Sequence, residues 1–138
     1  MRPKKSLPGM NKCRGHTIRP FIQQGKKIRA TATSFIAEIT QELNCKTKNL
    51  VYCITCRKCS NQYIGETERS LQARFLEHMK VTHKSTGEHY NLPGHQMADM
   101  QVTIIEKIFH TDPQFRKTRE KMWIERFNTK YKGLNKKT

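Results

Sequence analysis

The chain has 138 residues, enough for one compact domain with a tail and too few for two full-sized domains. Lysine and arginine number 27 against 11 aspartates and glutamates, and the formal charge of +16 indicates nucleic acid as the leading partner. No apolar run approaches the roughly 20 residues that cross a bilayer, and no apolar stretch of signal-peptide length follows the basic start, so we expect a soluble, intracellular protein.

The N-terminal third is basic and rich in turn-forming residues. Residues 1–37 contain nine Lys or Arg, and no acidic residue precedes Glu38. Prolines and glycines make residues 1–30 largely irregular, while the apolar positions of Ser34–Leu43 fall at helical spacing and predict a short helix. We interpret residues 1–45 as a basic arm that screens phosphates, with a solvated tail as the alternative.

Residues 46–138 contain the elements of a folded domain. Leu50–Thr55 and Gln62–Gly65 are short runs of β-branched and aromatic residues, which predict an antiparallel hairpin with Cys56–Asn61 as its turn. Thr67 or Ser70 can cap the helix that follows, which we expect to end near His83.

The rest of the chain predicts a loop, a strand and a helix. Glycine and proline make residues 84–100 a loop, and Gln101–Ile108 follows as a third strand. Asp112 before Pro113 begins a helix that runs to about Asn128. The predicted fold class is therefore α+β, or layered α/β, with a small three-stranded antiparallel sheet flanked by helices.

Some polar residues fall where apolar ones are expected. Glu120 shares the face of Trp123 and Phe127, and a carboxylate in that position is normally paired or bound to a metal. Pairing with an arginine at the edge of the core is the plain structural interpretation. Arg74 and His78 lie one turn apart on the preceding helix, where a solvated helix edge would explain them equally well.

Tyr52 and Tyr63 lie on the two strands expected to pair, and a buried phenol needs a hydrogen-bond partner. Two core tyrosines would be the ordinary explanation. Together with an arginine, a histidine and a carboxylate, however, this pair supplies what hydrolysis of a phosphodiester requires.

The cysteines indicate a metal site. The chain has five cysteines, of which Cys56 and Cys59 form a Cys-x-x-Cys pair. In a reducing compartment, metal binding accounts for them better than disulfides do. A redox pair is the alternative, but it calls for a helix that begins at the first cysteine, whereas the flanking segments predict strands.

These landmarks resemble the GIY-YIG nuclease superfamily over about residues 49–136. Leu50-Val51-Tyr52 is similar to its first motif, although Leu50 replaces the glycine, and Tyr63-Ile64-Gly65 matches the second motif. The remaining motifs are similar to the helix of Arg74 and His78, the helix of Glu120, and Gly133-Leu134-Asn135.

A closer resemblance is to the endonuclease domain of Penelope-like retroelements, in which a cysteine pair separates the two motif strands and a histidine pair follows. The pairs here are Cys56 with Cys59 and His89 with His95. Of the cysteine-rich segment that often precedes this domain, only Cys13 is present.

The resemblance implies a metal-dependent DNA endonuclease. Glu120 would hold one Mg²⁺, and Arg74 would pair with the scissile phosphate. Tyr52, Tyr63 or His78 would orient or deprotonate the attacking water, and the sequence leaves this choice open.

The resemblance also implies two structural roles. Asn135 would brace the catalytic site. Cys56, Cys59, His89 and His95 would hold a structural Zn²⁺ that ties the hairpin turn to the loop before the third strand.

The implied partners are DNA and a reverse transcriptase encoded in the same element, and the implied location is the nucleus. Two other functions remain open from the sequence. The first is a catalytically inactive, basic, zinc-containing module that binds nucleic acid. The second is an unrelated zinc protein that binds RNA, for which Glu120 would have no role.

Overall fold

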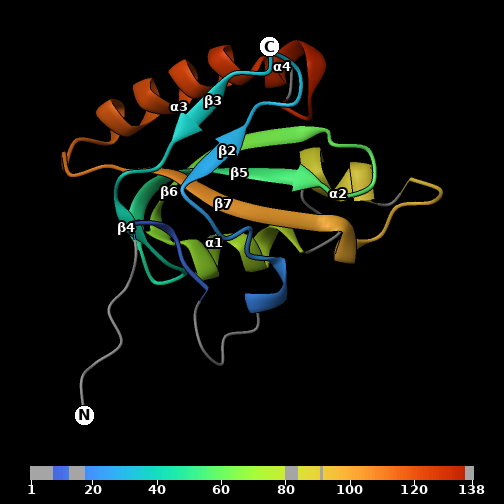
Figure 1. The fold of residues 1–138 in the computed structure, drawn as a ribbon, viewed down its shortest axis with the longest axis horizontal. Helices are drawn as coiled ribbons and strands as arrows, with labels where there is room; N and C mark the ends of the chain where they lie inside the picture. Colours follow the sequence, from blue (N-terminus) through green and yellow to red (C-terminus); the bar gives the residue numbers. More distant parts are fainter. Residues whose placement is uncertain (1–7, 13–17, 80–83, 91, 136–138) are drawn as a thin grey trace.

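A three-stranded antiparallel sheet forms the centre of the structure, a computed structural model that describes residues 8–12, 18–79, 84–90 and 92–135 (Figure 1). The strands are β5 (Lys48–Cys56), β6 (Gln62–Ser70) and β7 (Met100–Lys107), in the order β6-β5-β7. Residues 50–54 of β5 are all buried, because this apolar run lies in the middle of the sheet and both of its faces are covered. The three predicted strands and their antiparallel sheet are confirmed.

Helices lie on both sides of this sheet, with α1 (Leu71–His78) on one side and α3 (Pro113–Phe127) along the other (Figure 1). Ser70 caps α1 by accepting a hydrogen bond from the Ala73 amide. Asp112 caps α3 by accepting from the Gln114 amide, and Pro113 occupies the first turn, as predicted.

Asn128 ends α3 in a left-handed conformation, with φ 52°, and turns the chain into the short α4 (Thr129–Lys132). The predicted end of the last long helix near Asn128 is therefore confirmed. The expected extension of α1 to His83 is not found, because α1 ends at His78, and residues 80–83 lie outside the described residues.

The prediction of a loop over residues 84–100 is wrong in part. It contains α2 (Lys84–Tyr90) and the 3-10 helix η2 (Met97–Asp99). Thr86, His89 and Tyr90 of α2 are buried, so tertiary contacts hold a helix that its glycine and polar side chains do not favour.

The helix expected for Ser34–Leu43 is also wrong. This segment forms β3 (Ile36–Glu38), which pairs antiparallel with β2 (Lys27–Arg29), and β4 (Glu42–Leu43), which pairs parallel with β1 (Gly9–Met10). Ala37 and Ile39 are buried while the residues between and beside them are exposed, which is the alternation of a strand. The 3-10 helix η1 (Arg19–Phe21) lies between β1 and β2.

Described parts of the N-terminal third belong to the core. Ile18, Ile22 and Ile28 are buried, and Ile22 forms a parallel bridge with Val102 on the outer side of β7. The predicted basic charge is therefore carried by a segment that, where it is described, packs against the sheet.

Two side-chain carboxamides bond to the outer strands of the sheet as a neighbouring strand would. Gln41 donates to the Lys107 carbonyl (3.0 Å) and accepts from the Lys107 amide (2.8 Å) on β7. Asn135 donates to the Ile64 carbonyl and accepts from the Ile64 amide (both 2.8 Å) on β6. Both outer strands thus have backbone groups satisfied by a distant side chain.

Candidate active site

Tyr52 and Tyr63 lie on the same face of the sheet. Tyr52 pairs with Gly65, and Tyr63 pairs with Ile54, two residues along the same strand. Their rings are 6.4 Å apart. A Cβ on Gly65 would overlap the Tyr52 hydroxyl and lie 2.9 Å from the Tyr63 ring, so the glycine of the second motif provides the space for both phenols.

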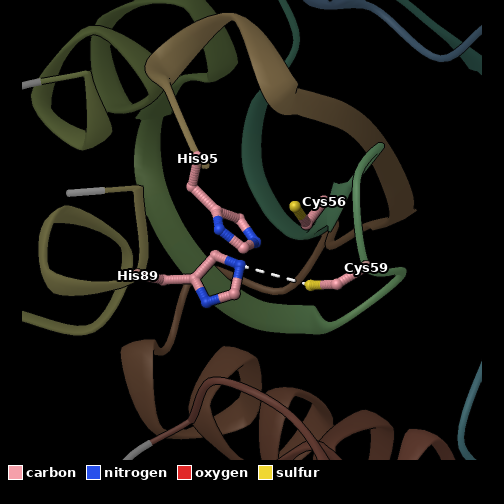
Figure 2. A group of neighbouring side chains, drawn as sticks. All are labelled: Cys56, Cys59, His89 and His95. Carbon is pink, nitrogen blue, oxygen red and sulfur yellow. Dashed lines mark hydrogen bonds between the residues drawn. The ribbon is translucent and has the colours of Figure 1, made fainter. Parts of the chain in front are cut away.

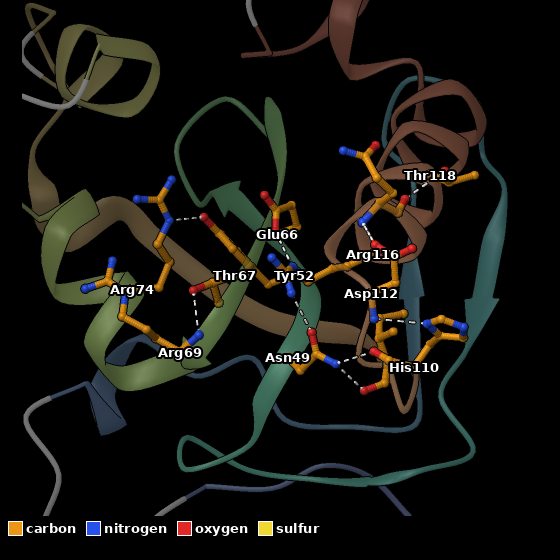
Figure 3. A network of polar contacts seen from close by, with 12 residues as sticks. Asn49, Tyr52, Glu66, Thr67, Arg69, Arg74, His110, Asp112, Arg116 and Thr118 are labelled. Atoms are coloured by element: carbon orange, nitrogen blue, oxygen red, sulfur yellow. Dashed lines mark hydrogen bonds and ion pairs between the residues drawn. The ribbon is translucent and has the colours of Figure 1, made fainter.

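Helix α1 brings Arg74 and His78 to Tyr52. Arg74 donates from Nε to the Tyr52 hydroxyl at 3.0 Å (Figure 3). His78 Nε2 lies 2.5 Å from the same oxygen. Tyr52 and His78 are fully buried, whereas Arg74 is half-buried. Arg74 is therefore not the solvated helix residue that its position in α1 would also allow.

The environment raises the pKa of both phenols. Burial raises the pKa of Tyr52 well above its usual value of 10.0, the neighbouring Tyr63 raises it further, and Arg74 opposes the shift. Burial is also the main cause of the raised pKa of Tyr63, which is half-buried and lies within the fields of Arg74 and Glu120. Both phenols therefore carry their proton at neutral pH.

Helix α3 places Glu120 in the same electrostatic neighbourhood. Burial raises its pKa to about 7, the carboxylate of Glu66 adds to the shift, and Lys117, Arg74 and Arg116 oppose it. Among the described residues, no hydrogen bond or ion pair engages the Glu120 carboxylate.

The arginines nearest to Glu120 on α3 are paired with other carboxylates. The Arg116 guanidinium forms an ion pair with Glu66 and donates to the side-chain Oδ1 of Asn49 at 2.7 Å (Figure 3). Arg119 donates to Glu106 at 2.8 Å. The arginine partner that would make Glu120 an ordinary core-edge residue is therefore engaged elsewhere.

A hollow of about 490 Å³ opens beside Glu120. Ile124 forms part of its apolar wall, and Asn135 lies at its border. The remaining lining residues are charged, polar or aromatic: Lys117, Lys121, Glu125, Asn128, Lys130 and Tyr131. Among the predicted site residues, direct contacts join Tyr52 to Arg74 and His78, and Glu120 and Asn135 border this hollow.

The cysteine and histidine pairs gather in a second cluster. Ligand atoms of Cys56, Cys59, His89 and His95 all lie within 4.8 Å of one another, and the side chains point toward a common centre (Figure 2). Cys56 ends β5, Cys59 lies in the following turn, and His89 lies on α2. Residues from three separate segments thus meet, as the sequence predicted.

The chemistry of this cluster fits a tetrahedral metal ion. Ligands of a four-coordinate zinc ion lie about 3.3–3.8 Å apart, and Cys59 Sγ is 3.4 Å from His89 Nε2. Among the described residues, His95 Nε2 is buried and has no hydrogen-bond partner. Burial lowers the pKa of His89, and His95 lowers it further, so the ring is neutral and able to bind a metal.

The two other cysteines among the described residues differ from each other. Cys53 is a free, buried thiol of the core. Cys45 is disulfide-bonded, so the expectation that metal binding rather than disulfides accounts for the cysteines is wrong at this position.

Two contacts at the site were not predicted from the sequence. Glu66 and Arg116 form an ion pair across 50 residues of sequence, and Thr86 lies 2.9 Å from His78 Nδ1. A glutamate directly after the second motif is the signal that could have indicated the ion pair, whereas no local pattern distinguishes Thr86.

Together, the sheet, the helices and the site define a GIY-YIG catalytic domain, and the family model of that description matches residues 48–135. The chain belongs to the GIY-YIG family, and this membership implies nuclease activity. Among solved structures, the catalytic domain of the homing endonuclease I-TevI is similar in fold, with a TM-score of 0.55 and 24% identity over 66% of this chain and 100% of that chain. No curated protein matches the chain.

Every helix among the described residues is too short or too polar to span a bilayer.

Proposed function

We propose that this chain is a metal-dependent DNA endonuclease that hydrolyses phosphodiester bonds. The observation that carries the proposal is the state of Glu120, a half-buried carboxylate without an ion-pair partner among the described residues, in the field of Arg74. Such a group is costly for stability alone and suited to a cation.

We assign Glu120 as the Mg²⁺ ligand. Its raised pKa reflects a site that lacks positive charge close to the carboxylate, since burial and Glu66 outweigh the neighbouring cations. A Mg²⁺ ion held by Glu120 would supply that charge and Lewis-acid stabilisation of the phosphate during attack. Glu120 would then hold the cation at the border of the hollow.

We assign Arg74 to the scissile phosphate. Its Nε is engaged with Tyr52, which fixes the plane of the guanidinium, and Glu77 lies 3.4 Å from Nη1. A guanidinium held in this way can donate to a phosphate oxygen and offset the charge that develops during attack.

Of the three candidates for the water-handling residue, Tyr63 is the best placed. Tyr52 and His78 are both fully buried and contact each other, so neither is accessible to an attacking water molecule. Tyr63 is partly exposed on the same face. Because its pKa is raised, we assign Tyr63 to orienting the attacking water by hydrogen bonding rather than to removing a proton in the free enzyme.

We assign the Cys56, Cys59, His89 and His95 cluster to a structural zinc ion. Four protein ligands complete a tetrahedral shell and leave no position for substrate. Lys117, Lys121 and Lys130 border the hollow beside Glu120 and, with the net charge of +16, support DNA affinity that is independent of sequence.

The biological setting of the proposal comes from the resemblance to Penelope-like retroelements. DNA cleavage would serve insertion of the element in the nucleus, beside a reverse transcriptase of the same element. The gathering of the cysteine and histidine pairs in one cluster supports this, because the resemblance rests on those pairs.

The test is nicking of supercoiled plasmid by zinc-loaded protein with Mg²⁺, compared with EDTA and with Glu120→Gln. Glu38→Gln is the matched control, since Glu38 is an exposed residue of β3 outside the site. We expect Mg²⁺-dependent nicking by the wild type and the control, and at least a hundredfold loss in Glu120→Gln. DNA binding without cleavage by any of the three would favour the alternative, an inactive zinc module that binds nucleic acid.

A further inference from the structure

Four side chains form a continuous chain of polar contacts inside the domain. Arg74 Nε contacts the Tyr52 hydroxyl (3.0 Å), which contacts His78 Nε2 (2.5 Å), and His78 Nδ1 contacts Thr86 Oγ1 (2.9 Å). Tyr52, His78 and Thr86 are each 0% exposed. Bulk water therefore has no access to these three residues, and the contacts between them contribute to satisfying their polar atoms.

The chemistry of the four groups fixes the direction of these bonds. A guanidinium only donates, so Tyr52 accepts from Arg74 and directs its own proton to His78 Nε2. His78 Nε2 then carries no proton, and Nδ1–H donates to the Thr86 hydroxyl. Arg74 and Tyr52 thus set the histidine tautomer, and the Thr86 hydroxyl accepts from its Nδ1–H and holds the ring in this orientation.

Helix α2 links this chain of contacts to the cysteine and histidine cluster. Thr86 and His89 lie three residues apart on α2, which places them on the same side of the helix. The same short helix therefore contacts the catalytic residues through Thr86 and the metal cluster through His89.

We propose that Thr86 is a positioning residue that orients Arg74 through His78 and Tyr52, and that α2 thereby couples the Cys56, Cys59, His89 and His95 cluster to the catalytic centre. The inference rests on the proposed function for the role of Arg74. His89, as a ligand of a bound metal ion, would hold α2 in place, and Thr86 would transmit that position to the guanidinium through His78 and Tyr52. Loss of the hydroxyl would remove the Thr86 contact at His78 Nδ1, and loss of the metal would release the helix that positions it.

The test compares zinc-loaded wild type, Thr86→Val and Thr86→Ser. Valine has the shape of threonine without the hydroxyl, and serine keeps the hydroxyl. The first readout is the nitrogen-15 spectrum of the His78 ring, assigned with His78→Asn, which reports the tautomer. The second readout is single-turnover nicking with Mg²⁺, alongside DNA affinity.

We expect Thr86→Val to change the His78 tautomer signal and to slow nicking on the order of tenfold, with DNA affinity unchanged, since it disturbs orientation and not binding. Thr86→Ser should restore both. An unchanged His78 signal in Thr86→Val would overturn the proposal, whatever the rate of nicking.

A second arm needs no substitution. Removing zinc from the wild type with a chelator should shift the His78 signal while the far-ultraviolet circular dichroism of the domain is largely retained. A His78 signal that is the same with and without zinc would overturn the proposed coupling through α2. If the wild type fails to cut DNA, the proposed nuclease activity fails, and the His78 spectra still decide whether Thr86 positions this chain of contacts.

Discussion

The Tyr52 hydroxyl occupies the space that a side chain on Gly65 would fill. The two residues are paired on β5 and β6, and a Cβ at Gly65 would lie 2.5 Å from the Tyr52 Cζ. The glycine of the second motif is thus required by the tyrosine of the first, which explains in steric terms why the two motifs occur together.

Gly65→Ala should therefore destabilise the fold and displace Tyr52 from Arg74. Overpacking of a buried site typically costs about 1–3 kcal/mol, and we expect a loss in that range by urea denaturation. The same substitution in a Tyr52→Phe background should cost less, because the hydroxyl is part of the overlap. An equal loss in both backgrounds would show that the clash lies elsewhere.

Glu120→Gln should stabilise the metal-free protein more at high pH than at low pH. The pKa of Glu120 is about 7 in the folded state against a usual value of 4.5, so the folded state binds the proton more tightly. The stability this gives the wild type is present below pH 4.5 and is lost as pH rises through 7. We expect the free energy of unfolding of the variant, relative to the wild type, to be higher at pH 8 than at pH 5 by about 1–2 kcal/mol. This figure is smaller than the full pKa shift would give, because the carboxylate is partly exposed.

Addition of Mg²⁺ at pH 8 should reduce that gain, because a cation at Glu120 stabilises the ionised carboxylate of the wild type and not the amide. A gain that is the same at both pH values would contradict the raised pKa of Glu120.

Cys59→Ser should lower the zinc content and the stability of the domain, because a structural metal site contributes directly to folding. Zinc released on denaturation can be measured with a chromogenic chelator. The matched control is Cys53→Ala, which removes a free cysteine outside the cluster and should retain the metal. Equal zinc in Cys59→Ser and the wild type would remove Cys59 from the ligand set.

Asn135→Ala should destabilise the C-terminal segment by about 1–3 kcal/mol, because the amide and carbonyl of the buried Ile64 lose their partners. Asn135→Asp should cost less, since a carboxylate still accepts from the Ile64 amide but cannot donate to its carbonyl. Hydrogen exchange of the Ile64 amide should quicken in Asn135→Ala, and protection equal to the wild type would contradict a bracing role.

The sequence predicted the central sheet and α3 because their signals are local. The apolar run of β5 and the Asp112-Pro113 start of α3 are readable within a few residues. That Arg74 and Glu120 would share a site with the two tyrosines was predicted from the spacing of the family motifs. The local sequence around each residue gave an ordinary structural explanation as well.

The remaining features depend on contacts that no local pattern encodes. The residues of β3 match helical spacing about as well as strand alternation, and pairing with β2 decides between them. Thr86 is an ordinary polar residue in sequence, and its contact with His78 depends on how α2 packs. For the same reason, the carboxylate partners of Arg116 and Arg119 could be identified only from the structure.

The carboxamides of Gln41 and Asn135 have a consequence for association. An exposed outer strand invites an extended segment of another chain to join the sheet, a common route to aggregation. Here the Gln41 side chain bonds to the backbone amide and carbonyl of Lys107 on β7, and Ile22 forms a bridge with Val102 on the same strand. On β6, the Asn135 side chain bonds to the backbone amide and carbonyl of Ile64. Strand addition at these positions would first have to displace a bonded group, so a fragment that begins at residue 46 would leave the outer side of β7 open and prone to self-association.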